Sequence, residues 1–227
     1  MCGRSLTRSW DRHVARASPT APELVASDQR CILARVPMST EMPTEKPRTI
    51  VAMAGLPGTG KSTLAAAIAR ALGALILDKD EIRDEMFGPD RIEYSREQDD
   101  VCCRAMHERA GELLARGAEV VVLDGRTYSK RYQVVELETM AERAGARLAL
   151  IECTASDEVV RARLEHDARA GAHPAKNRDF ELYRALRAAA EPIEREKLVI
   201  DTSRGALGEQ ASRCLAWLRT FTRRSSA

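Results

Sequence analysis

Apolar residues along this chain gather in short runs that are separated by longer stretches with helical spacing. The runs are rich in β-branched residues and have the lengths of buried strands. They cover residues 49–54, 74–77, 119–123, 147–153 and 197–200. The stretches that indicate helices cover residues 63–72, 96–116, 130–144 and 207–220, and a further helix is expected to begin after Ser156.

This alternation predicts a parallel sheet, because strands separated by helices pair in parallel through right-handed crossovers. Four of the five runs are apolar nearly throughout, as expected of strands that are covered on both faces. We therefore predict a three-layer α/β domain over residues 48–222, with a five-stranded parallel sheet and helices on both faces. Ligands of such sheets bind at the carboxyl ends of the strands, so the residues that follow each strand are candidates for a shared site.

The first 47 residues differ from the rest, since they contain five prolines and show no sustained periodicity. We expect a disordered N-terminal extension there. Its Arg-rich, acid-poor start also fits a transit peptide, and Met38 and Met42 would fit a later start of translation. Residues 223–227 are expected to form a short tail.

The segment 55–62, Gly-Leu-Pro-Gly-Thr-Gly-Lys-Ser, matches G-x-x-x-x-G-K-[ST] and lies between a predicted strand and a predicted helix. A phosphate-binding loop requires this context, because backbone N–H groups surround the phosphate while the helix N-terminus adds positive potential. Lys61 is predicted to reach the β- and γ-phosphates, and the Ser62 hydroxyl is predicted to bind Mg²⁺. The predicted nucleotide contacts are Gly55, Leu56, Pro57, Gly58, Thr59, Gly60, Lys61, Ser62 and Thr63. The alternative is a glycine-rich turn that only joins a strand to a helix.

Asp80 and Arg83 follow the second predicted strand at a spacing of three, which places them on one face of a helical turn. An aspartate that faces a γ-phosphate can accept the proton of an attacking hydroxyl, and an arginine beside it keeps the aspartate ionised and can hold the acceptor. We predict both residues to be catalytic and to bind the substrate. A helix cap with a solvated arginine is the alternative.

Asp124 follows the third predicted strand directly, which is the position of a carboxylate that orients Mg²⁺. Gly125 lets the backbone approach a ligand closely, and Arg126 is predicted to contact the acceptor or a phosphate. Arg131 could also face the acceptor. The alternative for Asp124 is a cap of the following helix.

A basic segment precedes the last strand, and a Gly-Ala-His-Pro turn interrupts it. Arginines on such a segment suit a lid that closes over transferring phosphate and neutralises its charge. The segment contains Arg161, Arg163, Arg169, Lys176 and Arg178. We predict Arg163 and Arg169 to be the functional arginines, against the alternative of a solvated helix face. His107, His166 and His173 are isolated and are expected to have surface or packing roles.

Composition restricts the partners of the chain. Its 36 basic and 34 acidic residues give a net charge of +2, so no global charge favours nucleic acid or a membrane. No apolar run is long enough to span a bilayer. The six cysteines form no C-x-x-C pair and none has a histidine at metal-binding spacing, which favours a reduced cytoplasmic protein without structural disulfides.

Taken together, these motifs resemble those of the P-loop kinases, in particular the group that contains AAA_33, zeta-toxin and polynucleotide-kinase-like domains. The resemblance covers about residues 48–222. It depends on GLPGTGKST at 55–63, LDKDEIR at 77–83, VVVLDGRT at 120–127, the Arg-rich segment at 161–178 and LVIDTS at 198–203. It implies a sheet of strand order 2-3-1-4-5, an Arg-bearing lid, ATP with Mg²⁺ as donor and a hydroxyl as acceptor, with Asp80 as base and Arg83 at the acceptor.

The function expected from these residues is phosphorylation of a small hydroxylated molecule by ATP. LDKDEIR is also similar to the LDGDNxR stretch of adenylylsulfate kinases, but Lys79 replaces the glycine and no KGLY-like segment precedes the lid. A polynucleotide 5′-hydroxyl kinase shares the D-x-x-R pattern, yet aromatic residues amount to only 4% of this chain and offer little for base stacking. A non-catalytic ATP-binding regulatory module is the alternative outside the enzymes. The sequence identifies neither the acceptor nor the oligomeric state.

Overall fold

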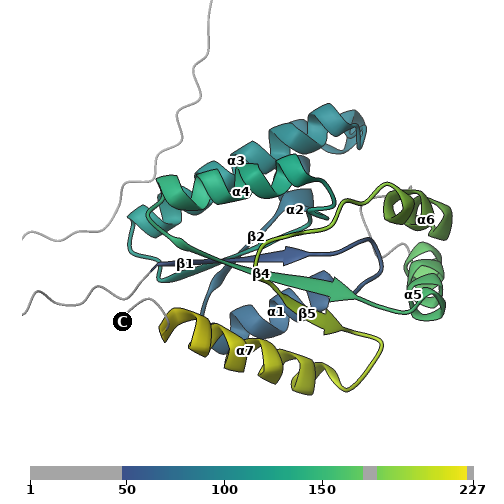
Figure 1. Ribbon diagram of the computed structural model, residues 1–227. Coiled ribbons are helices and arrows are strands. Elements are labelled where there is room, and N and C mark those ends of the chain that lie inside the picture. The colour runs from purple at the N-terminus through teal and green to yellow at the C-terminus, as the bar shows by residue number, and fades with distance from the viewer. Residues whose placement is uncertain (1–47, 171–177, 224–227) are drawn as a thin grey trace, which may run out of the picture. The chain divides into compact units, whose positions relative to one another are not determined.

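A parallel sheet with helices on both faces forms the centre of the computed structural model, which describes residues 48–170 and 178–223 (Figure 1). The predicted N-terminal extension, residues 1–47, lies outside the described residues. The strands are β1 (Thr49–Ala54), β2 (Leu75–Asp78), β3 (Val120–Asp124), β4 (Arg147–Thr154) and β5 (Leu198–Asp201). The helices are α1 (Lys61–Leu72), α2 (Lys79–Phe87), α3 (Arg96–Ala115), α4 (Arg131–Arg143), α5 (Asp157–Ala170), α6 (Phe180–Ala188) and α7 (Leu207–Arg223), with a 3₁₀ turn, η1 (Pro89–Arg91).

The sheet has the order β2-β3-β1-β4-β5 and every pairing is parallel, which confirms the predicted topology. The first strand is central, and its Val51 lies between Val122 of β3 and Ala149 of β4. The loop that leaves β1 therefore emerges at the middle of the carboxyl edge. Residues that follow β2, β3 and β4 flank this loop.

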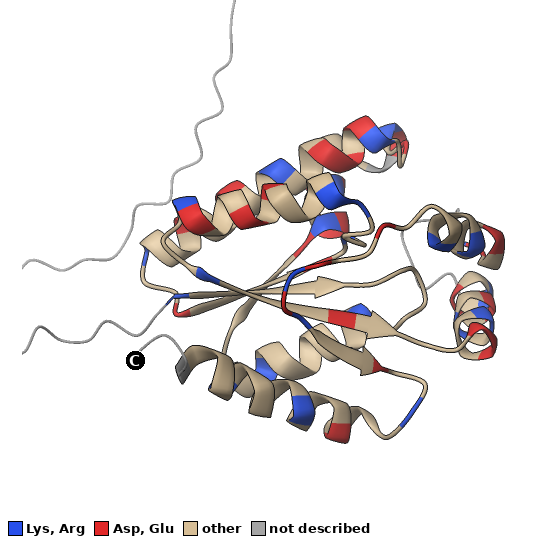
Figure 2. Cartoon of the chain, viewed as in Figure 1, with Lys and Arg blue, Asp and Glu red and all other residues tan. Residues whose placement is uncertain are grey.

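Alternate residues of β1 pack into two separate cores, as the two-residue period of a strand requires. Ile50 and Ala52 belong to the core beneath α2, α3 and α4, whereas Val51 and Met53 belong to the core formed with α1 and α7. Figure 2 shows that the strands carry few charged residues and that most Lys, Arg, Asp and Glu lie on the helices and loops. The strand alternation thus builds both cores without a buried charge in mid-strand.

The strands at the two edges of the sheet are not buried on both faces. Leu75 and Ile76 of β2 are 53% and 37% exposed, since β2 is the edge strand of the described sheet and pairs with β3 on one side. Val199 of the opposite edge strand β5 is 45% exposed. The apolar sequence of an edge strand therefore overstates its burial.

Two helices have no counterpart in the sequence-based prediction. The sequence of α2 is charged over most of its length, and its buried residues are Lys79, Ile82 and Arg83, so its apolar stripe is too thin to detect. Helix α6 follows residues 171–177, which lie outside the described part of the chain, and buries Tyr183. The other predicted helices and strands are confirmed, with boundaries that differ by at most three residues.

None of the helices in the described ranges combines the length and the hydropathy that are needed to cross a bilayer.

A matched pair of leucines tests the two-core arrangement. Leu150 of β4 is fully buried, so Leu150→Ala should lower the free energy of unfolding by about 2–5 kcal/mol, because it removes buried methyl groups and leaves a cavity. Leu75→Ala makes the same chemical change at the exposed edge and should cost less than about 1 kcal/mol. Urea denaturation of both variants checks the difference, and equal losses would contradict it.

Candidate active site

The loop between β1 and α1 has a conformation that depends on its glycines. Gly55, Gly58 and Gly60 have φ angles of 134°, 76° and 80°, which other residues rarely adopt. A Cβ atom on Gly55 would also lie 2.4 Å from the carbonyl oxygen of Cys153 in β4. The predicted strand–loop–helix context of the motif is confirmed.

The start of α1 leaves its backbone donors open. Gly60 caps the helix in a left-handed conformation without a side-chain hydrogen bond, and the first turn contains no acidic residue. The first N–H groups of a helix have no partner within the helix, and the helix dipole makes this end positive. The loop and helix together therefore form a cradle for an anion.

Lys61 places an ammonium group at the centre of this cradle. Its side chain is nearly buried, and Nζ donates to the Leu56 carbonyl oxygen at 2.9 Å. Burial lowers the pKa of Lys61 to about 8, against the opposing effect of Asp124, and Arg178 contributes to the lowering. Burial disfavours the charged form of the ammonium group, so an anionic partner such as phosphate would stabilise that form.

Leu56 connects the loop to the helices beyond the strand ends. Its carbonyl oxygen also accepts from the Thr59 hydroxyl at 2.7 Å, and its side chain packs against the cluster of Val160, Leu164 and Tyr183 from α5 and α6. Hydrogen bonds within the loop and apolar contacts with α5 and α6 thus both hold the loop in place.

Two aspartates end neighbouring strands beside the loop. Asp124 is 2% exposed, and its Oδ1 atom has no hydrogen-bond partner among the described residues. Asp78 pairs with Asp124 in the register of β2 and β3 and accepts the N–H of Asp80 at 2.7 Å. Burial raises the pKa of Asp78, and the neighbouring Asp124 carboxylate raises it further.

These residues fit a magnesium ion. Ser62 is exposed in the first turn of α1, and Oδ1 of the buried Asp124 has no hydrogen-bond partner among the described residues, as expected of side chains that bind a cation. Among residues 48–170 and 178–223, no cluster of three His, Cys, Asp or Glu side chains could hold a metal alone. Mg²⁺ commonly takes one or two protein ligands and completes its shell with phosphate oxygens and water.

Asp80 and Arg83 meet as predicted, and a third residue joins them. Arg83 donates to Asp80 Oδ1 and also to Asp99 Oδ1 in α3, and Lys79 Nζ donates to the same Asp99 oxygen at 2.6 Å. The Arg83 guanidinium lies 4.9 Å from the centre of the Tyr94 ring. Burial lowers the pKa of Arg83, but Asp99 and Asp80 outweigh it and leave the pKa raised.

Arg83 is therefore held on several sides. It is 1% exposed and is bound by two carboxylates, so its contacts fix the orientation of Asp80 rather than leave the guanidinium free. No sequence pattern marks Asp99, because its partner Arg83 lies 16 residues away in another helix.

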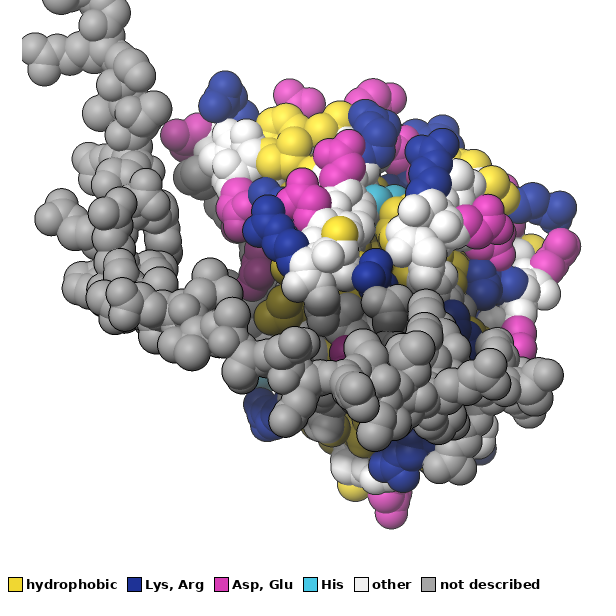
Figure 3. All heavy atoms as spheres, turned by 90° about the vertical axis from the view of Figure 1, so that its left-hand side faces the viewer, with side chains coloured by type: hydrophobic (Ala, Val, Ile, Leu, Met, Phe, Trp, Pro, Cys, Tyr) yellow, Lys and Arg dark blue, Asp and Glu magenta, His cyan; other side chains and the backbone are white. Residues whose placement is uncertain are grey.

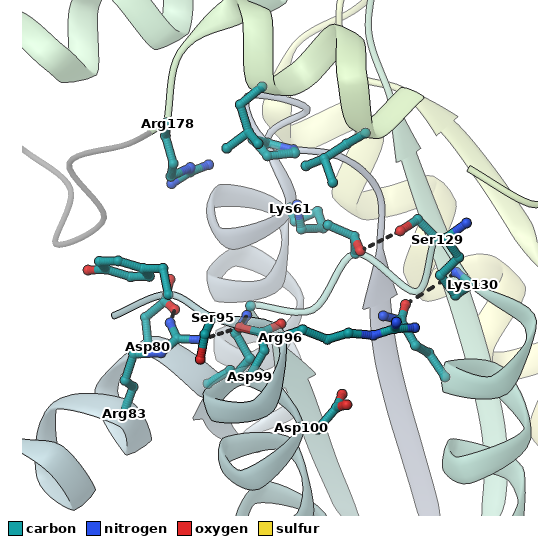
Figure 4. A pocket seen from close by; sticks show the side chains of 18 of the residues that line it. Lys61, Asp80, Arg83, Ser95, Arg96, Asp99, Asp100, Ser129, Lys130 and Arg178 are labelled. Atoms are coloured by element: carbon teal, nitrogen blue, oxygen red, sulfur yellow. Dashed lines mark hydrogen bonds and ion pairs between the residues drawn. The ribbon is translucent and has the colours of Figure 1, made fainter. Parts of the chain in front are cut away.

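A cavity of about 430 Å³ lies between these groups (Figure 4). Its walls come from the phosphate loop, the start of α2, the start of α3, the loop after β3, the start of α4, and α6 with the preceding Arg178. Arg178 points into it from above, opposite Lys61 (Figure 4). Lys61 and Asp80 line the same cavity, which brings the predicted phosphate and hydroxyl sites together.

A second cavity of about 420 Å³ lies on the other side of the loop. Arg163 borders it, donating to the Thr202 hydroxyl at 2.9 Å and to the carbonyl oxygens of Thr202 and Gly58 at 3.0 and 3.2 Å. Lys61 and Arg178 line both cavities. The two cavities therefore adjoin at the phosphate loop.

Arg178 stands out among the residues of the basic segment. Burial lowers its pKa, and Asp80 is the strongest of the carboxylates that oppose this effect. Arg163, one of the two arginines favoured by the sequence, borders the loop. Arg169 is exposed and donates to the Glu165 carbonyl oxygen of its own helix, so its predicted role remains a prediction. Lys176 lies outside the described residues.

Arg126 lies behind the cavity wall. It is 1% exposed and pairs with Asp100 at 2.8 Å and with Glu136 at 3.7 Å. Arg131 pairs with Glu194 at 3.1 Å on the surface. Neither arginine lines the cavity, and the prediction that Arg126 contacts the acceptor remains a prediction.

The histidines and cysteines within the described ranges contribute nothing to this cavity. His107 is buried in α3, where burial lowers its pKa to about 4, and His166 is exposed on α5. His173 lies outside the described residues. The described cysteines are free and buried.

With the geometry established, comparison with known proteins gives the family. Residues 50–193 match the model of AAA_33, described as an AAA domain. The chain belongs to the AAA_33 family. A search of curated proteins found no match.

Solved structures share the P-loop kinase fold of this AAA_33 chain. A gluconokinase from Sinorhizobium meliloti 1021 is 24% identical with a TM-score of 0.58, over 78% of this chain and 95% of that one. A sugar kinase from Janibacter sp. HTCC2649 is 18% identical with a TM-score of 0.55, over 76% and 95% of the two chains. The APS kinase CysC of Mycobacterium tuberculosis, solved with AMPPNP and APS, is 19% identical with a TM-score of 0.53, over 76% and 98%. At these identities the likeness shows the fold.

Two glycine-to-alanine variants test the loop geometry. Gly55→Ala should lower the free energy of unfolding by about 2 kcal/mol or more, because the new Cβ meets the Cys153 carbonyl and the φ angle is unfavourable. Gly111→Ala lies inside α3 with nothing within 4 Å of the new Cβ and should stabilise by about 0.5–1 kcal/mol. Thermal and urea unfolding measure both, and a neutral Gly55→Ala variant would contradict the described loop.

Proposed function

We propose that this protein is an ATP-dependent kinase that transfers the γ-phosphate to a hydroxyl group of a small molecule. The observation that carries the proposal is the shared cavity of Lys61, in a glycine-dependent anion cradle, and Asp80, held by Arg83. A phosphate site with an oriented carboxylate beside it has the parts that phosphoryl transfer to a hydroxyl needs.

In the proposed reaction, the loop N–H groups and Lys61 bind the phosphates of the nucleotide. Asp80 accepts the proton of the acceptor hydroxyl while the oxygen of that hydroxyl forms a bond to the γ-phosphorus. The bond from that phosphorus to the β,γ-bridging oxygen breaks, and ADP leaves with that oxygen. Arg178 faces the same space and neutralises charge on the transferring group.

Ser62 and Asp124 would hold Mg²⁺. When bound, the ion would neutralise negative charge that develops on the β- and γ-phosphate oxygens. Asp124 is buried beside Lys61, so its carboxylate would lie close to the phosphates of the nucleotide.

The acceptor is proposed to be a small molecule. Three neighbours of the same fold are named as a gluconokinase, a sugar kinase and an APS kinase, which are kinases of small molecules. A polynucleotide acceptor is less favoured, because the tyrosine rings that line the cavity already contact arginines. Arg83 lies over the Tyr94 ring and Arg96 lies over the Tyr132 ring, which reduces the ring surface that is open to a stacked base.

Figure 3 shows the face at the amino ends of the strands, away from the cavity, where Lys and Arg side chains are mixed with Asp and Glu side chains. The free, buried cysteines fit a reduced compartment, so we propose the cytoplasm as its location. A non-catalytic ATP-binding module would not need an oriented Asp80, and ATP consumption with and without acceptors separates the two functions.

Asp80→Asn tests the base. The substitution keeps the shape and a hydrogen bond to Arg83 but removes the proton acceptor, so kcat should fall by about 100-fold or more while ATP affinity stays nearly unchanged. Asp84→Asn changes an exposed carboxylate of the same helix and serves as the control. Steady-state kinetics and nucleotide titration measure both effects, and a fully active Asp80→Asn variant would exclude the base role.

The pKa of Lys61 predicts a pH dependence of nucleotide binding. The free protein loses the Lys61 proton at pH of about 8, whereas bound phosphate favours the charged ammonium and raises that pKa. Affinity for MgATP should therefore be constant below pH 8 and fall about tenfold per pH unit above it. Lys61→Arg should remove this decline, because a guanidinium stays protonated. Calorimetric titrations from pH 7 to pH 10 check the slope, and identical pH profiles of the two proteins would contradict the assignment.

A further inference from the structure

The cations around the 430 Å³ cavity differ in whether they already have partners. Lys79 pairs with Asp99, and Arg83 pairs with Asp80 and Asp99. Lys130 pairs with Glu191 at 3.2 Å and also donates to the Ala189 carbonyl oxygen at 2.6 Å. These three cations are neutralised by the protein itself.

For Lys61 and Arg178 we expect a different anionic partner. Both line the two adjoining cavities at the phosphate loop, where the proposed kinase would place the nucleotide phosphates. Phosphate would therefore neutralise them. One cation of the cavity wall, Arg96, then remains without an assigned anionic partner.

Arg96 has no carboxylate partner among the described residues, but it is held in place. Its Nε atom donates to the Tyr132 hydroxyl at 3.3 Å, and its guanidinium lies 5.1 Å from the centre of the Tyr132 ring. These contacts leave both terminal NH₂ groups without a hydrogen-bond partner among the described residues. A guanidinium in this state presents a fork that matches a carboxylate or a phosphate.

The location of Arg96 adds a second positive element. It is the first residue of the 20-residue helix α3, whose preceding Ser95 caps the N–H of Gln98 at 3.2 Å. Figure 4 shows the Arg96 side chain extending across the cavity toward Ser129 and Lys130, away from Asp80. A molecule bound to both Asp80 and Arg96 would thus span the cavity.

The two acids of the cavity wall that share helix α3 with Arg96 already have cationic partners. Asp99 is bound by Lys79 and Arg83, and Asp100 is bound by Arg126 at 2.8 Å. Buried cations balance these two charges, so this part of the wall does not select for an amine. Ser95, Ser129 and Gln133 supply neutral polar groups between the two ends.

We propose that the acceptor is a hydroxylated small molecule that carries a carboxylate or phosphate group, which Arg96 binds while Tyr132 holds the guanidinium in place. This inference depends on the proposed kinase function for the position of the hydroxyl, and it names the substrate class of that same site. Arg96 is then the residue that determines specificity for the acid over the neutral polyol.

Matched acceptor pairs test the proposal. D-gluconate is compared with D-glucitol, D-glycerate with glycerol, and glycerol 3-phosphate with glycerol, which separates carboxylate from phosphate recognition. The native protein should prefer at least one acid over its neutral partner by about 10- to 100-fold in kcat/KM, the range of one charge-assisted contact. ADP formation in a coupled assay measures each rate.

Arg96→Gln should reduce that preference to about threefold or less, mainly through the KM of the acceptor, and leave MgATP affinity unchanged. Arg96→Lys should restore part of the preference, since the charge returns without the fork. Arg104→Gln removes an exposed arginine from the same helix, outside the cavity wall, and should leave the preference intact. A preference for neutral polyols, or an acid preference that survives Arg96→Gln, overturns the proposal.

Binding measurements separate this inference from the kinase proposal. Titration of the same acids into the native protein with Mg²⁺ and AMPPNP should detect binding that Arg96→Gln weakens by about tenfold or more. Binding of this kind without transfer to any acceptor would contradict the kinase proposal and support the anion site. Absence of binding for every acid in the panel would overturn the anion site.

Discussion

The arrangement of the candidate site depends on one nearly buried ammonium group, that of Lys61, at the middle of the sheet's carboxyl edge. Lys61 can occupy this position because β1 is the central strand and the loop that follows it passes close to β4. That approach requires a glycine at position 55, and the reversal into α1 requires another at position 60. Nearby Asp124 limits the electrostatic cost, and the carbonyl oxygen of Leu56 accepts a hydrogen bond from the ammonium group.

The parallel sheet explains why the remaining groups gather around this charge. All five strands end at one edge, so Asp78 and Asp124 become neighbours although 46 positions of sequence separate them. The helices that follow begin at the same edge, which brings the first turns of α2, α3 and α4 into one cavity wall. The groups that the proposed reaction uses, namely Asp80, the phosphate loop and Arg96, thus come from separate segments of the chain.

Much of this arrangement could be predicted from the sequence. The apolar runs and the glycine motif predicted the strands and the phosphate loop, because both signals are local in sequence. The pairing of Asp80 with Arg83 could be predicted because three residues make nearly one helical turn. Contacts between distant segments could not be predicted: Asp99 meets Arg83 from another helix, and Arg178 rather than Arg169 lines the cavity. The sequence position of Arg126 after β3 predicts a site residue. Its burial against Asp100 depends on the position of α3, which the sequence does not indicate.

The part of the cavity wall that carries Arg96 and Tyr132 lies outside the hydrophobic core. Arg96 and Tyr132 belong to the first turns of α3 and α4, whereas the core contacts of these helices begin later, at Cys102 and Val134. Substitutions at these two helix starts would change the molecule that the proposed kinase accepts, without disturbing the phosphate loop or the hydrophobic core. Diversification within such a lineage would leave the glycine loop nearly constant while the beginnings of these helices diverge.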